Sequence, residues 1–130
     1  MTVLVAFVPR PEGLAALEKG ISMAKGSGET LLVVNTSEGG QDEDSALANA
    51  TEIERIETML AAAGVRGEVK QFVRGNDVVA EIEIMVASRS VDLLIIGLRK
   101  RSAVGKFLLG SVAQEILMNI SCPILAVKAG

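Results

Sequence analysis

Short apolar runs alternate with helical patterns along the whole chain. Five runs predict β-strands, and four of them are nearly continuous apolar stretches, as expected of strands buried on both faces. These runs are Val3–Val8, Leu31–Val34, Glu68–Val73, Asp92–Ile96 and Ile124–Val127. Between them, apolar residues recur every three or four positions, which is the spacing of an amphipathic helix. The predicted helices are Pro11–Ala24, Leu47–Ala63, Val78–Val86 and Val112–Ile120.

Several residues mark where these elements begin and end. Pro11 suits the first turn of one helix, and Gly64 suits the position just after another. Asn76 can cap the helix that follows it, since its side-chain oxygen can accept from unpaired backbone N–H groups. The segment Ser37–Ser45 is rich in glycine, serine and acidic residues, which predicts a surface loop or a lid.

Strands that alternate with helices predict an α/β fold in one domain spanning residues 1–130. Right-handed crossovers between parallel strands place helices on both faces of an open sheet. The run Glu68–Val73 is the most polar, so we expect it at a sheet edge, where one side is wet. In such sheets, ligands bind beyond the carboxyl ends of the strands, where the strand order reverses.

Composition excludes several classes of function. The net charge of −3 gives no overall attraction for nucleic acid, and without Trp or Tyr there is no aromatic platform for stacking bases. The chain has no histidine, the usual proton shuttle and commonest metal ligand. Its single cysteine, Cys122, has apolar flanks and is expected to be a buried small side chain. We therefore expect no nucleic-acid partner, no metal and no catalysis that needs histidine.

The hydrophobic content of 49% is enough for a real core, and 22% charged residues of interspersed sign argue against disorder. The apolar start Val3–Val8 has no basic leader and is far too short to span a bilayer. We expect a cytoplasmic protein without a membrane partner.

The segment between Gly97 and Gly110 carries the candidate chemistry. It leaves the run Asp92–Ile96 and enters the last helical pattern. A strand, a glycine-bearing loop and a helix start form a phosphate cradle, because N–H groups at a helix N-terminus are unpaired and face the positive end of the dipole. Cations on this loop can meet phosphate oxygens as well. They are Arg99, Lys100, Arg101 and Lys106.

Each of these features also has a purely structural explanation. Gly97 and Gly110 permit a tight exit from the strand and close packing of the last helix. Ser111 and Gln114 have the spacing of a capping box, in which the Ser111 hydroxyl accepts from the Gln114 N–H. A basic loop is most often a solvated face. The residues alone leave both explanations open.

Four segments resemble the universal stress protein (UspA) family and together span the chain: VLVAF, VRGNDVVAEI, VDLLIIG and GSVAQEILMNISCPILAVK. The last is the most specific, because Gly-Ser, a helix and Cys-Pro before the final strand occur in the family's order and spacing. The resemblance implies a Rossmann-like fold of the adenine nucleotide alpha hydrolase type. It also implies five parallel strands in the order 3-2-1-4-5.

Nucleotide-binding members of this family carry the pattern Gly-x-x-Gly-x9-Gly-[Ser/Thr], with phosphates on the loop. Matched position by position, the first and third glycines are Gly97 and Gly110, and the hydroxyl is Ser111. Lys100 stands at the second glycine. A side chain there costs on the order of 1 kcal/mol if the backbone is left-handed. Its positive charge can instead take over the glycine's role.

Members that bind ATP also tend to have an aspartate shortly after the first strand, where this chain has Val8 followed by Pro9. Loss of that carboxylate weakens recognition of the sugar or base more than that of phosphate. The resemblance thus implies a stress-response protein that binds ATP, AMP or another phosphate compound, with slow hydrolysis at most. The binding residues it implies are Gly97, Lys100, Gly110, Ser111, Val112, Val8 and Pro9.

A nucleotide-free protein that acts through protein association is the alternative function. A flavodoxin-like electron carrier ranks third, because the aromatic residues that sandwich a flavin are absent. The apolar run Ile124–Val127 falls at a sheet edge in the family's strand order. An uncovered apolar edge invites pairing, so we expect a homodimer in which this strand meets its own copy.

Overall fold

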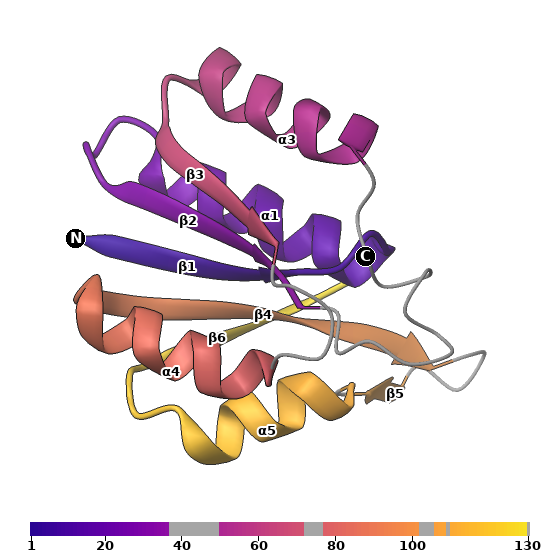
Figure 1. Ribbon diagram of the computed structural model, residues 1–130. Coiled ribbons are helices and arrows are strands. Elements are labelled where there is room, and N and C mark those ends of the chain that lie inside the picture. The colour runs from indigo at the N-terminus through magenta and orange to yellow at the C-terminus, as the bar shows by residue number, and fades with distance from the viewer. Residues whose placement is uncertain (37–49, 72–76, 102–105, 109, 130) are drawn as a thin grey trace.

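A parallel sheet carries helices on both of its faces (Figure 1). The structure is a computed structural model and describes residues 1–36, 50–71, 77–101, 106–108 and 110–129. Its strands are β1 (Thr2–Phe7), β2 (Thr30–Asn35), β3 (Arg66–Gln71), β4 (Val91–Arg101), β5 (Lys106–Leu108) and β6 (Ile124–Lys128). Its helices are α1 (Pro11–Ala24), α3 (Ala50–Ala63), α4 (Val78–Ser88) and α5 (Ser111–Asn119).

The parallel strands follow the order β3-β2-β1-β4-β6. This confirms the expected α/β sheet in the order 3-2-1-4-5, with β6 as its fifth strand. One strand was not expected: β5 pairs antiparallel with the end of β4, where Arg101 lies opposite Lys106. The prediction that the fourth strand stops at Ile96 is wrong, because pairing with β6 and then β5 supplies hydrogen-bond partners as far as Arg101.

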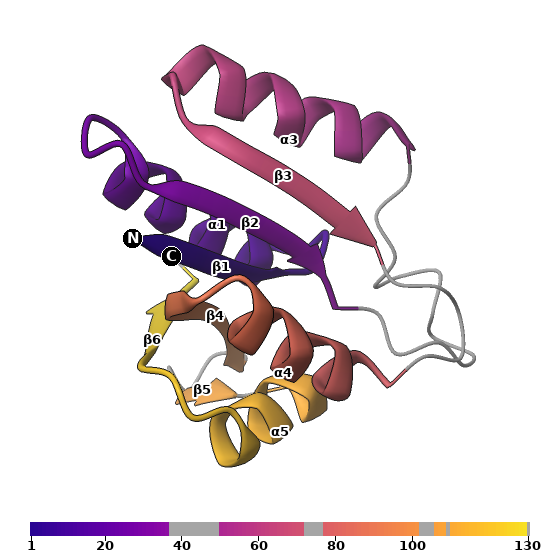
Figure 2. The same cartoon turned by 60° about the vertical axis from the view of Figure 1, so that its left-hand side comes forward.

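Alternate side chains of the central strands enter two separate cores. Val3 and Val5 of β1 pack with α1 and α3, whereas Leu4 and Ala6 pack with α4 and α5. Figures 1 and 2 show the same arrangement, with α1 and α3 on one face and α4 and α5 on the other. Burial on both faces explains why the first strand is apolar at every position.

The polar strand β3 lies at one edge of the sheet, as predicted. Its residues are exposed except for the half-buried Val69. The guanidinium of Arg89, which follows α4, donates to the exposed Glu68 carboxylate at 2.6 Å. Charged side chains of this kind discourage a second chain from pairing with the edge.

The start of α4 differs by one residue from the prediction. Asp77 is the N-cap, and its Oδ1 accepts from the N–H groups of Val79 and Ala80 at 3.1 and 3.2 Å. Asn76, the predicted cap, lies outside the described residues, as do the expected lid Ser37–Ser45 and the expected helix start at Leu47. Within the described ranges, no helix is long and apolar enough to cross a membrane.

The predicted capping box at α5 is wrong. Ser111 is the first residue of the helix, and Gly110 is its N-cap. The Gln114 N–H donates to the Gly110 carbonyl at 2.9 Å, which is the first bond of the helix ladder. The hydroxyl of Ser111 is therefore not at the position from which a side chain caps a helix.

Ser90 joins α4 to β4 in the left-handed region, with φ of 52°. Ser90→Gly is expected to raise the free energy of unfolding by about 0.5–1 kcal/mol, because relief of left-handed strain exceeds the entropy that glycine adds to the unfolded chain. Urea denaturation followed by circular dichroism measures the change. The matched variant Ser88→Gly, at the helical end of α4, should lower stability. A loss of stability in Ser90→Gly would contradict the argument.

Candidate functional site

The sheet divides at its carboxyl end between β1 and β4. The last pair of the β1–β4 ladder is Val5 opposite Ile95, although both strands continue beyond it. The ladders that join β1 to β2 and β4 to β6 run on to the last residues of β1 and β6. We call this position, where the strand order also reverses, the switch point. It is where ligands bind in open parallel sheets.

The described helices α1, α3, α4 and α5 all begin at this carboxyl end (Figure 1). The first turn of α4 is capped by Asp77, whereas the N-cap of α5 is Gly110, which has no side chain. The N–H groups of Ser111, Val112 and Ala113 have no acceptor within α5, because its ladder begins at Gln114. Such groups, with the helix dipole behind them, attract an anion.

Gly97, the first glycine of the predicted cradle, serves packing. A Cβ built on it would collide with the backbone carbonyl of Glu12, in the first turn of α1. The missing side chain thus lets α1 lie directly on β4. Gly110 is different, because a Cβ there would meet nothing within 4 Å. The structural explanation therefore holds for Gly97 and finds no support at Gly110.

The segment after Gly97 is in part a β-hairpin and not the glycine loop that was expected. Lys100 lies opposite Phe107 in the antiparallel ladder of β4 and β5. In the described part of the chain, Ser90 is the non-glycine residue with positive φ, so the Lys100 backbone does not carry left-handed strain. The same ladder sets Arg99 opposite Leu108, two residues before Gly110. The start of α5 therefore follows directly from the basic hairpin.

Val8 and Pro9 form a tight turn between β1 and α1. The Arg10 N–H donates to the Val8 carbonyl at 2.8 Å, and a Cβ on Gly13 would collide with that same carbonyl. The first turn of α1 thus touches Val8 on one side and Gly97 on the other. These predicted site residues are brought together, whereas Val112 is half-buried and packs against the core on the α5 face.

Sequence reasoning missed the hydrogen bonds of Asn35, at the end of β2. The Phe7 carbonyl, the last of β1, accepts from Asn35 Nδ2 at 3.1 Å and from the Thr36 N–H at 2.9 Å. Gln71 Nε2 in turn donates to Asn35 Oδ1 at 3.2 Å. The signal in the sequence was a polar residue that closes the apolar run Leu31–Val34.

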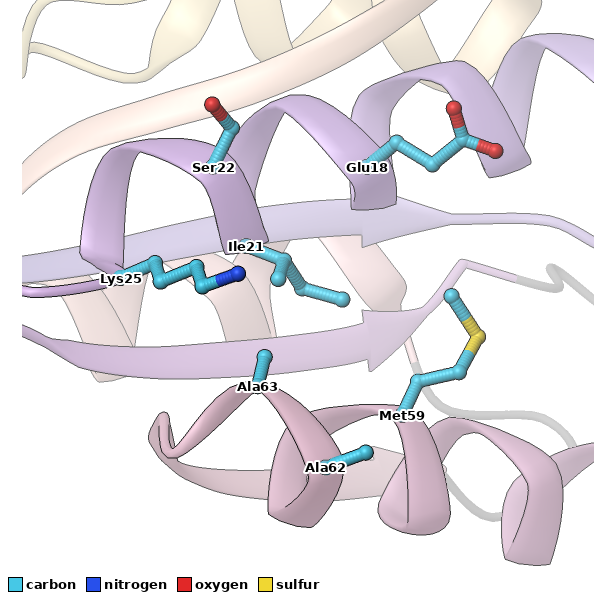
Figure 3. A pocket seen from close by; sticks show the side chains of 7 residues that line it. All are labelled: Glu18, Ile21, Ser22, Lys25, Met59, Ala62 and Ala63. Atoms are coloured by element: carbon cyan, nitrogen blue, oxygen red, sulfur yellow. The ribbon is translucent and has the colours of Figure 1, made fainter.

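A groove of about 600 Å³ lies elsewhere, between α1 and α3 (Figure 3). Ile21 and Lys25 extend from α1 toward α3, and Met59 and Ala63 point back from α3. Glu18, Ser22 and Ala62 complete the lining. The groove lies along the sides of two helices and away from their N-termini, and its apolar floor suits no phosphate. We therefore place the candidate site at the switch point.

Cys122 is half-buried, and burial raises the pKa of its thiol, with a smaller contribution from the negative charge of Asp92. A backbone hydrogen bond offsets part of the rise. The thiolate is therefore disfavoured, which suits a packing role and not a nucleophile. No group of three or more potential metal ligands occurs among the described residues.

The two glycines make a matched pair for mutation. Gly97→Ala is expected to lower the free energy of unfolding by about 2 kcal/mol or more, because the first turn of α1 must move off β4. Gly110→Ala should cost less than about 1 kcal/mol, since space is open there and only a preferred N-cap residue is lost. Thermal and urea unfolding of both variants measure this. Equal stabilities would contradict the assignment of Gly97 to packing.

Comparison with known proteins identifies the family. The sequence model of the Universal stress protein family matches residues 1–128. A universal stress protein of Mycolicibacterium smegmatis is 40% identical over 126 residues, which are 97% of this chain and 96% of that protein.

Among solved structures, the universal stress protein of Archaeoglobus fulgidus in complex with dAMP has a TM-score of 0.68 at 20% identity, covering 98% of this chain and 96% of that one. A universal stress protein family member of Arabidopsis thaliana with AMP bound also has a TM-score of 0.68, at 16% identity, covering 100% of this chain and 92% of that one. These likenesses establish the shared fold. On its sequence and its fold, the chain belongs to the universal stress protein family.

Proposed function

We propose that this protein is a stress-response protein that binds an adenine nucleotide at the switch point, with the phosphate at the N-terminus of α5. The observation that carries the proposal is the start of α5, where Gly110 leaves three backbone N–H groups without a side-chain cap at the end of the divided sheet. Proteins of the same fold hold dAMP and AMP, which supports an adenine nucleotide as the ligand.

Charge supports the same position for the phosphate. Arg99 is exposed near the end of β4, and its partner Leu108 is three residues before Ser111, the first residue of α5. Lys100, Arg101 and Lys106 belong to the same hairpin by sequence and pairing. Cations beside a helix N-terminus add to its attraction for a phosphate group.

The ligand is an adenine nucleotide without strong selectivity for ATP. Val8 stands where family members that bind ATP tend to have an aspartate, so a contact to the sugar or base is lost while the phosphate site remains. Hydrolysis is slow at most. The chain has no histidine, and β1 and β2 end in Phe7 and Asn35, neither of which accepts a proton at neutral pH.

Calorimetric titration with AMP tests this function. The wild-type protein should bind, and Lys100→Gly should weaken binding by about fivefold, equivalent to about 1 kcal/mol, and flatten its salt dependence. The reason is that Lys100 lies in an extended, paired backbone, so a glycine gains no geometry there and loses a charge. Lys19→Ala, which removes an exposed cation from α1, should leave binding unchanged.

Two results would contradict parts of this proposal. Tighter AMP binding by Lys100→Gly would mean that the lysine blocks the site. No heat from the wild-type protein with AMP or ATP would favour the alternative, a nucleotide-free protein that acts through association.

We also propose that the protein is a homodimer joined through β6. This strand pairs with β4 in the described structure and has Ala126 exposed between the half-buried Leu125 and Val127. The Pro123 carbonyl accepts from the Leu94 N–H, and the Ala129 N–H donates to the Leu98 carbonyl. Backbone groups alternate in direction along a strand, so those of Ala126 face away from β4. They can pair with a second copy.

Ala126→Pro is expected to convert the dimer to a monomer, because proline removes an outward N–H without breaking a bond to β4. Sedimentation velocity at micromolar concentration measures the mass, and circular dichroism checks that the fold persists. Lys128→Ala, at the end of the same strand, is the control and should remain dimeric. A wild-type monomer, or a dimer that survives in Ala126→Pro, would overturn the proposed interface.

A further inference from the structure

A buried carboxylate stands in the first turn of α1. Among the described residues, Glu12 is the only charged residue that is buried, and it is 8% exposed. Over that same part of the chain, its carboxylate accepts no hydrogen bond and forms no ion pair. A charge that is taken out of water is costly unless a partner compensates for it. Glu12 therefore has acceptor capacity that the protein itself leaves unused.

Glu12 lies where the sheet divides. A Cβ built on Gly97 of β4 would lie 3.0 Å from the Glu12 Cβ, and one built on Gly13 would collide with the Val8 carbonyl, just after β1. The first turn of α1 thus spans the gap between the ends of β1 and β4. Side chains of a helix lean toward its N-terminus, which for α1 is the carboxyl end of the sheet (Figure 1). The Glu12 side chain is therefore directed to the switch point.

Two structural explanations do not account for the burial of Glu12. An acidic residue in a first helical turn interacts favourably with the helix dipole, but an exposed side chain does so equally well. A nearby cation could compensate the charge, and Arg99 is two residues beyond Gly97 along β4. Within the described ranges, however, no ion pair joins Arg99 to Glu12. The unpartnered carboxylate points instead to a ligand.

The chemistry of an adenine nucleotide limits what this ligand group can be. Its phosphate is an anion and would be repelled, and a lone carboxylate makes no metal site; the described residues hold no group of three potential metal ligands. The groups that can donate are the ribose hydroxyls and the amino group of the base. Of these, the ribose is the one joined directly to the phosphate. An acidic residue that accepts from a ribose hydroxyl is a recurrent feature of nucleotide sites in parallel sheets.

The two helix starts also favour the ribose. α1 and α5 begin at the same end of the sheet and lie on opposite faces (Figure 1). A nucleotide with its phosphate at the start of α5 can therefore cross the switch point and present its sugar to the first turn of α1.

We propose that the Glu12 carboxylate accepts hydrogen bonds from the ribose hydroxyl groups of the bound nucleotide and so favours a ribonucleotide over its 2′-deoxy form. The inference rests on the proposed nucleotide binding and adds recognition of the sugar. The two oxygens of an ionised carboxylate can accept from the neighbouring 2′ and 3′ hydroxyl groups at once, and hydrogen bonds to a charged acceptor are strong. The contact comes from α1, so it needs no acidic residue at the end of β1, where Val8 stands.

The test is the ratio of affinities for AMP and 2′-deoxy-AMP, measured by calorimetry on the full chain in the presence of EDTA. The wild-type protein should prefer AMP about tenfold, because the deoxy sugar leaves the buried carboxylate without one donor. Glu12→Gln should reduce the preference to about twofold, since a neutral oxygen accepts more weakly, and Glu12→Ala should abolish it. Glu18→Gln is the control. Glu18 is exposed on the same helix, so the same change of charge should leave the ratio unchanged.

Unfolding midpoints separate a ligand contact from a purely structural role. Without nucleotide, Glu12→Gln should unfold at or above the wild-type temperature, because the described structure loses no hydrogen bond or ion pair with the charge. AMP should raise the midpoint less in Glu12→Gln than in the wild type. A variant that is less stable than the wild type, yet keeps the full preference for AMP, would assign Glu12 to the helix start alone and overturn the inference.

The outcomes also separate this inference from the function on which it rests. If the wild-type protein binds AMP and 2′-deoxy-AMP equally, the role of Glu12 is overturned and nucleotide binding stands. The same follows if AMP binds only when magnesium replaces EDTA, because Glu12 would then serve a cation. If the wild-type protein binds neither nucleotide under either condition, both proposals are overturned.

Discussion

The contact between the first turn of α1 and Gly97 holds the two halves of the sheet together at their carboxyl ends. Beyond Val5 and Ile95, the β1–β4 ladder provides no further bonds. The chain leaves β1 through the turn at Val8, enters α1, and sets the backbone of Glu12 directly on β4. Backbone packed on backbone is stiff, because there is no side chain between them that could change rotamer. The separation of β1 and β4 at the switch point depends on this contact.

A second constraint acts on the other side of β1. Its last carbonyl, that of Phe7, accepts from the side chain of Asn35 and from the backbone of Thr36. Both donors lie at the end of β2, in Asn35 and Thr36. These hydrogen bonds hold the end of β1 against β2 and away from β4. A buried carbonyl without a partner would cost free energy, and these two hydrogen bonds satisfy the Phe7 carbonyl.

The apolar runs allowed a parallel sheet with helices on both faces to be predicted, because such strands are buried on two faces. The strand order was implied only by the resemblance to the universal stress protein family. The sequence did not reveal the extension of β4 or the strand β5. The residues Arg99–Arg101 are charged and look like a loop, and pairing with Lys106–Leu108 keeps them extended. Such pairing is a tertiary effect that no local pattern records. The cap of α5 was misassigned because Gly110 and Ser111 are both residue types that occur at a helix start.

The glycine pattern itself has two meanings that the structure separates. Gly97 is required by the close approach of α1, whatever the protein binds. A family member that binds no ligand would need a glycine at this position for the same reason. Gly110 meets no packing demand, yet it is the residue that leaves the N-terminus of α5 without a side-chain cap. α4 begins at the same edge, but the Asp77 side chain already accepts from two of its first N–H groups. Fewer backbone donors are therefore left there for an anion. The start of α1 also lacks a side-chain cap, but Pro11 there has no N–H, so α5 offers an anion more backbone donors and is the favoured place for a phosphate.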